Sequence, residues 1–280
     1  MPPSTNTNEK IFKMNKIVLI TGGSSGIGKA IGEYLSQKGY VVYGTSRNPE
    51  NIKNSMFPLL ALEVKNPESI EAAIKKVIAI SGRIDVLINN AGVGITGPLE
   101  EIPMAEIKNN FDVNLFGPIE VMKAVLPQMR AQKSGLIINI TSIAGYMGLP
   151  FRSIYSASKG ALELITESLR MEVKSFGIKI TNVAPGDFAT NIASGRFHSP
   201  IIKGSDYEIN YGDNLKTLNE HVDSGSNPME MAEAIFKIIE NPNPSIHYKI
   251  GIFMQQFSIV LKRILPDNVF EKMLMKHYKL

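Results

Sequence analysis

The stretch Thr21-Gly22-Gly23-Ser24-Ser25-Gly26-Ile27-Gly28 joins a short apolar run to an amphipathic segment. Gly22 permits a tight turn, Gly26 lets the backbone approach a ligand, and Gly28 lets a helix pack close to a strand. Free N–H groups and the dipole at the start of a helix attract anions. The stretch therefore predicts a site for the pyrophosphate of a dinucleotide. The residues expected to contact it are Gly22, Ser24, Ser25, Gly26, Ile27 and Gly28.

On both sides of this turn, short runs rich in Ile, Val and Leu alternate with longer helical patterns. The expected strands are Lys16–Thr21, Tyr40–Ser46, Pro58–Val64, Ile84–Asn89, Gly135–Thr141, Ile178–Ala184 and Ile246–Ile250. The expected helices between them are Ile27–Lys38, Pro67–Ile80, Met104–Ala131, Ser153–Phe176 and Pro228–Ile239. This alternation is typical of βαβ units. We therefore predict a single doubly wound α/β domain of Rossmann type, with a seven-stranded parallel sheet and helices on both faces.

Three segments fall outside this alternation. Residues 1–14 are polar and predict a disordered tail, while residues 15–250 form the expected dinucleotide-binding catalytic domain. Within that domain, residues 188–226 are rich in Gly, Ser, Asn and Asp, a composition typical of a lid over a substrate. Four aromatic residues in the lid favour an apolar ligand, namely Phe188, Phe197, Tyr207 and Tyr211. Residues 251–280 predict a helical extension of about two helices, separated at Pro266.

An apolar stripe runs along this extension. It consists of Phe253, Phe257, Val260, Leu261 and Ile264. Three interpretations stay open: packing in the core or against a partner subunit, a wall of a substrate pocket, or contact with a membrane surface. The last is suggested by the basic residues beside the stripe, which are Lys262, Arg263, Lys272, Lys276 and Lys279.

The composition excludes several classes of function. The chain has 280 residues, 44% hydrophobic and 20% charged, which is ordinary for a globular protein. The net charge of +4 is not gathered in a basic block, so we expect no nucleic-acid partner. The absence of Cys excludes disulfides, thiolate nucleophiles and Cys-based zinc sites, and the four His form no metal-ligand spacing. No signal peptide and no apolar run near 20 residues are present, so we expect a cytoplasmic protein without a transmembrane segment.

The end of the second expected strand reads Gly44-Thr45-Ser46-Arg47. A dinucleotide fold usually places a carboxylate here, where it binds the adenosine ribose. In this chain Arg47 and Ser46 instead offer donors to a 2′-phosphate, which predicts NADP(H) in preference to NAD(H). The alternative is that Arg47 is a solvated surface residue for which Glu50 competes.

Two residues with acid/base potential, Tyr155 and Lys159, lie four positions apart in an expected helix, so they share one face. A tyrosine titrates about three pH units too high for a general base at neutral pH, and lowering its pKa that far requires about 4 kcal/mol of preferential stabilisation of the anion. A neighbouring lysine cation could supply it. The spacing alone is also expected by chance, so a coincidence on the helix surface is the alternative.

Two further polar residues are placed near the ligand edge of the sheet. Ser142 closes the fifth strand, where its hydroxyl could polarise a carbonyl or, as the alternative, cap a turn. Asn114 lies in a long expected helix, four residues before Pro118. Because proline has no N–H, the Asn114 carbonyl loses its usual helical donor, and the helix should kink. We hypothesise that this oxygen holds a water next to Lys159, with a purely structural kink as the alternative.

Short turn-forming segments follow the fourth and sixth expected strands. They are Asn89–Gly92 and Pro185–Thr190. The small residues Asn90, Ala91 and Gly92 could let the backbone approach a ribose. The second segment, with Pro185 and Gly186, could direct Thr190 toward a carboxamide, and for both segments the alternative is simple turn chemistry.

Taken together, six motifs resemble the short-chain dehydrogenase/reductase family in order and spacing, over about residues 14–250. They are Thr21–Gly28, Asn89–Gly92, Asn114, Ser142, Tyr155-x3-Lys159 and Pro185–Thr190. The resemblance implies reversible hydride transfer between a nicotinamide cofactor and an alcohol or carbonyl. It implies that Tyr155 is the acid/base and that Lys159 lowers its pKa and binds the nicotinamide ribose. Ser142 would hold the substrate oxygen, Asn114 the relay water, and Thr190 the nicotinamide.

The resemblance has two departures. The family's Asp-Val pair that contacts adenine is represented here by Glu63-Val64, which we expect to bind in the same place. The family's usual Asp-Gly-Gly ending is replaced by His247-Tyr248-Lys249-Ile250-Gly251 and the extension. This ending and the Thr-Ser-Arg turn resemble the hydroxysteroid and retinol dehydrogenase branch. That branch implies NADP(H), bulky apolar substrates and a homodimer, with a tetramer as the alternative.

The leading functional hypothesis is therefore an NADP(H)-dependent carbonyl reductase or alcohol dehydrogenase. Its small-molecule substrate would be a lipophilic ketone, aldehyde or secondary alcohol. Two alternatives stay open: a noncatalytic NADP(H)-binding sensor, and an epimerase or dehydratase that uses the same Tyr-Lys pair.

Overall fold

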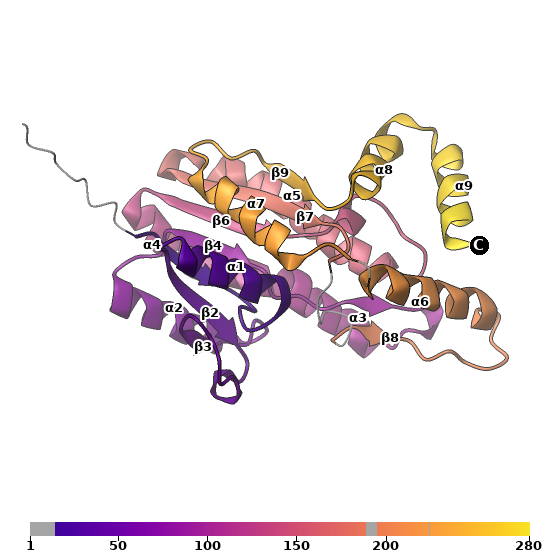
Figure 1. Ribbon diagram of the computed structural model, residues 1–280, viewed down its shortest axis with the longest axis horizontal. Helices are drawn as coiled ribbons and strands as arrows, with labels where there is room; N and C mark the ends of the chain where they lie inside the picture. The colour runs from indigo at the N-terminus through magenta and orange to yellow at the C-terminus, as the bar shows by residue number, and fades with distance from the viewer. Residues whose placement is uncertain (1–14, 189–194, 224) are drawn as a thin grey trace, which may run out of the picture.

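The sheet is the centre of the fold. The computed structural model describes residues 15–188, 195–223 and 225–280, and within them seven parallel strands form one sheet in the order β3-β2-β1-β4-β6-β7-β9 (Figure 1). The strands are β1 (Ile17–Ile20), β2 (Val41–Ser46), β3 (Leu59–Ala61), β4 (Val86–Asn89), β6 (Gly135–Ile140), β7 (Ile178–Pro185) and β9 (His247–Ile250). The predicted doubly wound parallel sheet is confirmed. Its strand order changes direction between β1 and β4, where such sheets bind ligands at the carboxyl ends of the strands.

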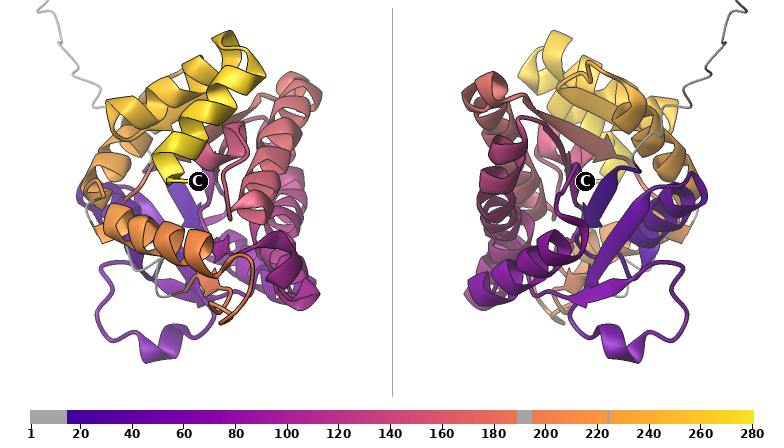
Figure 2. Two further views of the ribbon diagram at one scale, coloured as in Figure 1. Left: turned by 90° about the vertical axis from the view of Figure 1, so that its right-hand side faces the viewer. Right: turned by 90° about the vertical axis from the view of Figure 1, so that its left-hand side faces the viewer.

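Helices cover both faces of the sheet (Figure 2). On one face, α1 (Gly26–Gln37) packs against α7 (Pro228–Glu240), and together they bury an apolar cluster against the strands. On the other face, a second apolar cluster is buried against the strands by α2 (Pro67–Ser81), α4 (Gly117–Gln132) and α5 (Ser153–Glu172). Every residue of β1 and β4 is buried, as expected for strands with both faces covered.

The helix predicted over Met104–Ala131 is not continuous. It consists of α3 (Met104–Phe111), a π-helical turn (Asp112–Phe116) and α4. At the end of the turn, the Gly117 N–H bonds to the Asp112 carbonyl, five residues back, and the next residue is Pro118, which has no N–H. The irregularity expected near Asn114 is therefore present, in the form of a widened turn.

Residues 195–223 contain regular structure that the sequence did not predict. Strand β8 (Phe197–His198) pairs in parallel with β5 (Ile95–Thr96), and α6 (Glu208–Asp223) follows. Tyr211 of α6 is buried, and its hydroxyl donates to the Ser199 carbonyl at 2.9 Å. This part of the predicted lid is thus tied to the body of the domain through β5.

The chain ends in two helices, α8 (Phe253–Ile264) and α9 (Asp267–Tyr278), which we call the C-terminal hairpin. Ile259 and Phe270 are its buried apolar residues, and they pack in one cluster with Ile143 and Met147. Four residues of the predicted stripe, Phe253, Phe257, Val260 and Ile264, are exposed, whereas Leu261 packs against this cluster. Packing in the core of the chain is therefore correct for Leu261 and wrong for the other four residues. Within the described ranges, no helix has the length and apolarity needed to cross a bilayer.

Candidate active site

The glycine-rich turn between β1 and α1 has the backbone shape of a phosphate cradle. Gly22 and Gly26 have φ angles of +65° and +53°, in the left-handed region that favours glycine. A Cβ atom at Gly28 would overlap the Gly22 carbonyl oxygen and the Asn90 amide. Ser25, at the N-cap of α1, makes no side-chain bond to the first turn of the helix. The N–H groups there stay available to an anion, so the turn fits a dinucleotide pyrophosphate.

The turn is held by the ends of its two neighbouring strands. The Asn90 side-chain amide donates to the Thr21 and Gly22 carbonyls at 3.0 and 3.1 Å. The Thr21 hydroxyl accepts from the Asn90 and Ala91 N–H groups, and the Thr45 hydroxyl accepts from the Gly22 N–H. The segment after β4 therefore braces the cradle, which is a structural task the sequence alone did not show.

Arg47 follows the end of β2 and is exposed. No ion pair between Arg47 and Glu50 is found in the described part of the chain, so this competing contact is absent. Ser46 lies at the end of β2, and its hydroxyl accepts a bond from the Asn48 N–H at 3.3 Å. A guanidinium and a hydroxyl are therefore present where a ribose carboxylate would usually be.

Glu63 and Val64 lie just beyond β3. The Glu63 carboxylate accepts from the Lys65 N–H at 3.2 Å, and the Glu63 N–H donates to the Ser69 hydroxyl at 3.0 Å. Val64 is buried, and a Cβ at Gly117 would lie only 2.9 Å from it. The pair thus forms the turn that leads into α2.

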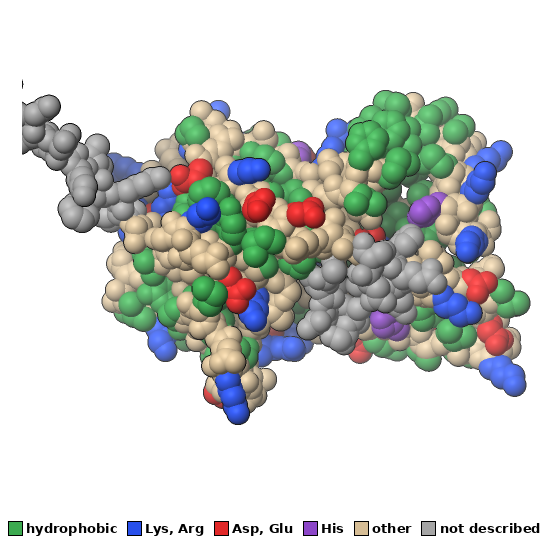
Figure 3. Space-filling model, viewed as in Figure 1, with side chains coloured by type: hydrophobic (Ala, Val, Ile, Leu, Met, Phe, Trp, Pro, Cys, Tyr) green, Lys and Arg blue, Asp and Glu red, His purple; other side chains and the backbone are tan. Residues whose placement is uncertain are grey.

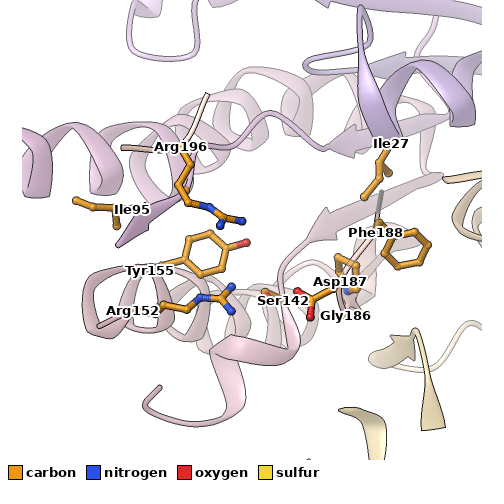
Figure 4. A pocket seen from close by; sticks show the side chains of 11 residues that line it. Ile27, Ile95, Ser142, Arg152, Tyr155, Gly186, Asp187, Phe188 and Arg196 are labelled. Carbon is orange, nitrogen blue, oxygen red and sulfur yellow. The ribbon is translucent and has the colours of Figure 1, made fainter. Parts of the chain in front are cut away.

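A pocket at the carboxyl edge of the sheet brings together residues from six parts of the chain (Figure 4). It is lined by Ile27, Gly94, Ile95, Ser142, Arg152, Tyr155, Pro185, Gly186, Asp187, Phe188 and Arg196. Ser142 and Tyr155, predicted from separate motifs, therefore share one pocket with Ile27 of the glycine-rich turn. Of the four lid aromatics, only Phe188 lines this pocket, so the argument from four aromatics to an apolar ligand is weakened.

Ser142 is almost fully buried at the start of the short 3-10 helix Ile143–Tyr146. Its hydroxyl oxygen accepts from the Ala144 N–H at 3.1 Å, which is the turn-capping role given above as the alternative. This bond uses an oxygen lone pair and leaves the hydroxyl proton able to donate. Ser142 can therefore cap the turn and face the pocket at once.

Lys159 is buried behind Tyr155, one turn along α5. Its ammonium donates to the Ile140 carbonyl at 2.9 Å, and a Cβ at Gly92 would lie 3.4 Å from Nζ. Burial lowers the pKa of Lys159, while Tyr155 and Glu163 oppose that change. The alternative that Lys159 is a surface residue spaced from Tyr155 by coincidence is therefore wrong.

Asn114 lies in the π-helical turn and is completely buried. Its side chain makes two bonds to one residue: Oδ1 accepts from the Val93 N–H at 2.9 Å, and Nδ2 donates to the Val93 carbonyl at 2.8 Å. It also lies close to Gly92, because a Cβ atom added at Gly92 would be 3.1 Å from Asn114 Oδ1. Asn114 thus fixes the segment between β4 and β5. The relay water stays a prediction.

Three charged residues of the pocket were given no role by the sequence analysis. The Arg152 guanidinium lies 5.4 Å from the centre of the Tyr155 ring. Arg196 reaches in beside Tyr155 (Figure 4), and its buried Nη1 has no hydrogen-bond partner in the structure. Burial lowers the pKa of Arg196, and the charge of Arg152 adds to that effect. The Asp187 carboxylate accepts from Gln255 at 2.7 Å. Of these three residues, only Arg152 had a local sequence signal for a place in the site, because it lies about one helical turn before Tyr155.

The C-terminal hairpin reaches this pocket from outside. Gln255 of α8 also accepts from the Asp187 N–H at 3.2 Å, and it leaves no space for a Cβ at Gly186. Burial raises the pKa of the Tyr278 hydroxyl, at the end of α9, whereas the charge of Arg152 and a hydrogen bond with it oppose that rise. The hairpin thus contacts two residues that line the pocket, Asp187 and Arg152, while none of the residues of the apolar stripe lines the pocket itself.

A buried polar network lies behind Lys159, centred on Glu163. The carboxylate accepts from the Tyr146 hydroxyl at 2.8 Å, from the Asn182 amide at 3.1 Å and from the Thr141 hydroxyl. His247 Nδ1 lies 2.8 Å from the same carboxylate. Burial and the charge of Glu163 raise the pKa of Tyr146. Sequence reasoning missed this network, although Glu163 follows Lys159 by four residues on one helix face.

Two predictions about the site, the Thr190 contact and the absence of a metal site, can be followed only within the described residues. Thr190, the expected nicotinamide contact, lies outside the described residues. Over residues 15–188, 195–223 and 225–280, no cluster of three or more His, Asp or Glu side chains is arranged to hold a metal ion.

Comparison with known proteins identifies the family. A sequence model described as short chain dehydrogenase matches residues 16–200. The chain is 42% identical to 3-ketodihydrosphingosine reductase of Bacteroides thetaiotaomicron, over 91% of this chain and 95% of that protein. It is 33% identical to human retinol dehydrogenase 8, over 85% and 82% of the two chains. The crystal structure of a short-chain dehydrogenase from Streptomyces avermitilis superposes with a TM-score of 0.81 at 31% identity, covering 95% of this chain and 97% of that one. This chain belongs to the short-chain dehydrogenase family.

Proposed function

We propose that this protein is an NADP(H)-dependent oxidoreductase that reduces a long-chain, lipophilic ketone and can run in reverse as an alcohol dehydrogenase. The observation that carries the proposal is the single pocket in which Ser142 and Tyr155 meet Ile27 of the glycine-rich turn. A carbonyl in this pocket is within reach of two hydroxyl donors. Lys159 lies buried directly behind them.

The chain's own residues manage a proton in this reaction. When bound, the nicotinamide cofactor supplies the hydride that reduces the carbonyl carbon. The Ser142 hydroxyl donates a hydrogen bond to the carbonyl oxygen, and the Tyr155 hydroxyl transfers its proton to that oxygen as negative charge develops there. The Lys159 ammonium stabilises the resulting phenolate electrostatically. Asn114 holds Val93 and Gly92 in place around Lys159, and its carbonyl anchors the water that returns the proton.

The cofactor is NADP(H) in preference to NAD(H). The glycine-rich turn, with Gly22, Gly26 and Gly28, holds the pyrophosphate, and Arg47 with Ser46 holds the 2′-phosphate. Support comes from the exposed Arg47 guanidinium, which has no competing carboxylate partner among the described residues. Glu63 and Val64 form the wall toward adenine, and Thr190 contacts the nicotinamide.

The substrate is a long-chain amino ketone of the keto-sphingoid type. One argument is the similarity, over nine-tenths of the chain, to a protein named 3-ketodihydrosphingosine reductase. A second argument is the pocket wall, which combines the apolar Ile27, Ile95 and Phe188 with the carboxylate of Asp187. This carboxylate lies beside Ser142 (Figure 4) and can accept from an ammonium group next to the ketone, a contact for which the Arg152 and Arg196 guanidinium groups of the same pocket compete.

The functional unit is a homodimer formed through α4 and α5. Its support is the exposure of large apolar side chains on this side of the molecule: Leu164 of α5 is 67% exposed, and Phe116, just before α4, is 53% exposed. Sedimentation of a Leu164→Glu variant tests this, because a dimer through α4 and α5 should dissociate while a different dimer should not.

The decisive experiment follows NADPH absorbance with a long-chain 2-amino-3-ketone, its counterpart without the amino group and an unrelated aldehyde. We expect oxidation of NADPH with the ketones, faster than with NADH. Tyr155→Phe should lower kcat about 10²–10⁴-fold, the usual contribution of general acid catalysis, and leave the Kd of NADPH unchanged. Wild-type turnover by Tyr155→Phe would refute the mechanism. Binding of NADPH without oxidation of any carbonyl would favour a sensor, and turnover without release of oxidised cofactor would favour an epimerase or dehydratase.

A further inference from the structure

The helix α8 turns its apolar side to solvent. The exposed residues, which we call the α8 apolar face, are Ile252, Phe253, Met254, Phe257, Val260 and Ile264. Phe253 is 73% exposed and Ile264 is 67% exposed. The rings of Phe253 and Phe257 stack with their centres 5.6 Å apart. Figure 3 shows this patch as a continuous apolar area over α8.

The inner side of α8 is, by contrast, partly polar. Gln255 contacts Asp187, the Ser258 hydroxyl donates within the helix to the Gln255 carbonyl, and Ile259 is the buried apolar residue of the helix. A surface helix normally places its apolar stripe toward the core and its polar residues toward water. Here the larger apolar stripe is on the outside. An apolar area of this kind on a surface marks a contact with another apolar phase or partner.

The charge around this face identifies that partner. Residues 251–280 contain five Lys and Arg but two Asp and Glu, a side-chain net charge of +3, whereas the whole chain carries +4. Arg263 is exposed beside Ile264, about 100° around the helix, at the border of the apolar face. Lys272, Lys276 and Lys279 are exposed on α9. An apolar face bordered by cations is the pattern of a helix that lies in the interface of an anionic bilayer.

A second copy of the chain fits this face less well. A twofold interface brings the same patch of both subunits together, so two hairpins of equal positive charge would face each other. The dimer proposed above uses α4 and α5 instead. A bilayer with anionic headgroups satisfies both features of the hairpin, because its acyl region accepts the apolar residues and its headgroups accept the cations.

We propose that the C-terminal hairpin docks the enzyme on an anionic lipid surface, with the α8 apolar face inserted at the boundary of headgroups and acyl chains. The same helix contacts Asp187 in the pocket, and Tyr278 of α9 contacts Arg152. The docked hairpin therefore lies between the lipid phase and the pocket. A lipophilic ketone can then enter the pocket from the bilayer, a consequence that rests on the proposed function.

Flotation of the full-length protein with phosphatidylcholine vesicles, with and without phosphatidylglycerol, tests the docking. We expect binding that requires the anionic lipid and weakens with salt. Phe253→Ser should reduce the partition coefficient at least about 10-fold, from the lost burial of one large apolar side chain. Arg263→Gln should reduce it about five-fold on anionic vesicles only. The matched control is Ile80→Ser on α2, where Ile80 is 61% exposed and α2 lies at the other end of the molecule from α8 (Figure 1).

The absence of Trp from the chain provides a direct probe. In a Phe253→Trp variant, the single indole should shift its emission to shorter wavelength with anionic vesicles and be quenched by brominated acyl chains. Absence of both signals together with absence of flotation would overturn the proposal. An equal loss of binding in Ile80→Ser would also overturn it. Conversion of a dimer into a monomer by Phe253→Ser, with vesicle binding unchanged, would assign the face to a subunit contact instead.

The same preparations separate this proposal from the proposed function. Turnover of a short-chain, water-soluble ketone without vesicles depends on the pocket and not on docking. Activity in that assay without vesicle binding contradicts the docking alone. Vesicle binding without turnover of any ketone contradicts the reductase function and leaves the docking supported.

Discussion

Replacing Glu163 by Gln provides the sharpest test of how the catalytic lysine is kept charged. Glu163 lies one helical turn beyond Lys159 on α5, buried among Thr141, Tyr146 and Asn182. Gln has nearly the same shape but no charge, so the variant removes the anion while filling the same space. We expect two separable effects, one on stability and one on the pH dependence of turnover.

The stability effect follows from the bonds made by one oxygen. Tyr146, Asn182 and His247 all lie within bonding distance of Glu163 Oε2. If that position becomes an amide NH2, at least two hydrogen bonds to a charged acceptor are lost, at about 1.5–3 kcal/mol each. The total of about 3–6 kcal/mol agrees with the usual result of breaking a buried charge pair. For a chain of 280 residues, whose unfolding entropy near Tm is about 0.6 kcal/mol/K, Tm should fall by roughly 5–10 °C.

The kinetic effect concerns the proton on Lys159. Side chains four apart on a helix lie about 6 Å from each other, and at an effective dielectric constant of about 20 their attraction is about 3 kcal/mol, or about two pKa units. Burial already lowers the pKa of Lys159, and Glu163 opposes this. Without Glu163 the pKa falls further, so the lysine loses its charge at lower pH. The alkaline limb of the kcat profile should therefore move to lower pH.

The assay is the pH profile of kcat for wild type and Glu163→Gln, measured below the melting temperature of both. The matched control is Glu172→Gln, since Glu172 is exposed on the same helix and its carboxylate accepts from the Ser168 hydroxyl at 2.9 Å. Its profile should match that of wild type. If Glu163→Gln melts earlier but keeps its alkaline limb, the network is structural and the electrostatic argument is refuted.

Three further substitutions test the cofactor and substrate contacts. Arg47→Asp should lower kcat/KM for NADPH about 10–100-fold and favour NADH, because a charge-assisted bond is replaced by repulsion; a retained preference for NADPH would contradict the assignment. Gly28→Ala should raise the Kd of NADPH at least about 10-fold in fluorescence titration, since a Cβ there overlaps the Gly22 carbonyl, whereas an unchanged Kd would show that the cradle can relax. Asp187→Asn should raise KM about 10-fold for the amino ketone but not for its counterpart without the amino group, and an equal rise for both would argue against an ammonium contact.

The fold was predictable where the amino-acid composition of a segment indicates how deeply it is buried. Strands covered on both faces favour apolar side chains at every position, and β1 (Ile17–Ile20) and β4 (Val86–Asn89) come close to that pattern, whereas β9 (His247–Ile250) at the sheet edge is half-buried and partly polar. The two-residue strands β5 and β8 are too short to show any periodicity, and they were missed. The break between α3 and α4 was marked by Pro118, and the structure places it in the π-helical turn Asp112–Phe116 just before that residue.

The site was predictable where its residues follow directly from strand ends or share one helix. Ser142, Tyr155 and Lys159 belong to this kind. Gln255 is a different case, since it meets Asp187 across 68 positions of sequence, and no local pattern predicts such a contact. Arg196 likewise enters the pocket from within the segment predicted to form the lid, where no local pattern marks it. Glu163 had a local signal, its spacing from Lys159, but a glutamate on a helix is usually solvated, so burial had to be seen.

The C-terminal hairpin joins two processes that the rest of the domain keeps apart. Its inner side contacts two pocket residues, Asp187 through Gln255 and Arg152 through Tyr278, and its outer side is the α8 apolar face. In the proposed docked state, a lipid surface that favours one position of α8 would also favour one arrangement of Asp187 and Arg152. Because such coupling is reciprocal, a substrate that binds better to the docked arrangement would strengthen docking by the same factor. The proposed docking would thus let one pair of helices set both the selection of substrate and the attachment to a membrane, while the glycine-rich turn and Tyr155 stay unchanged.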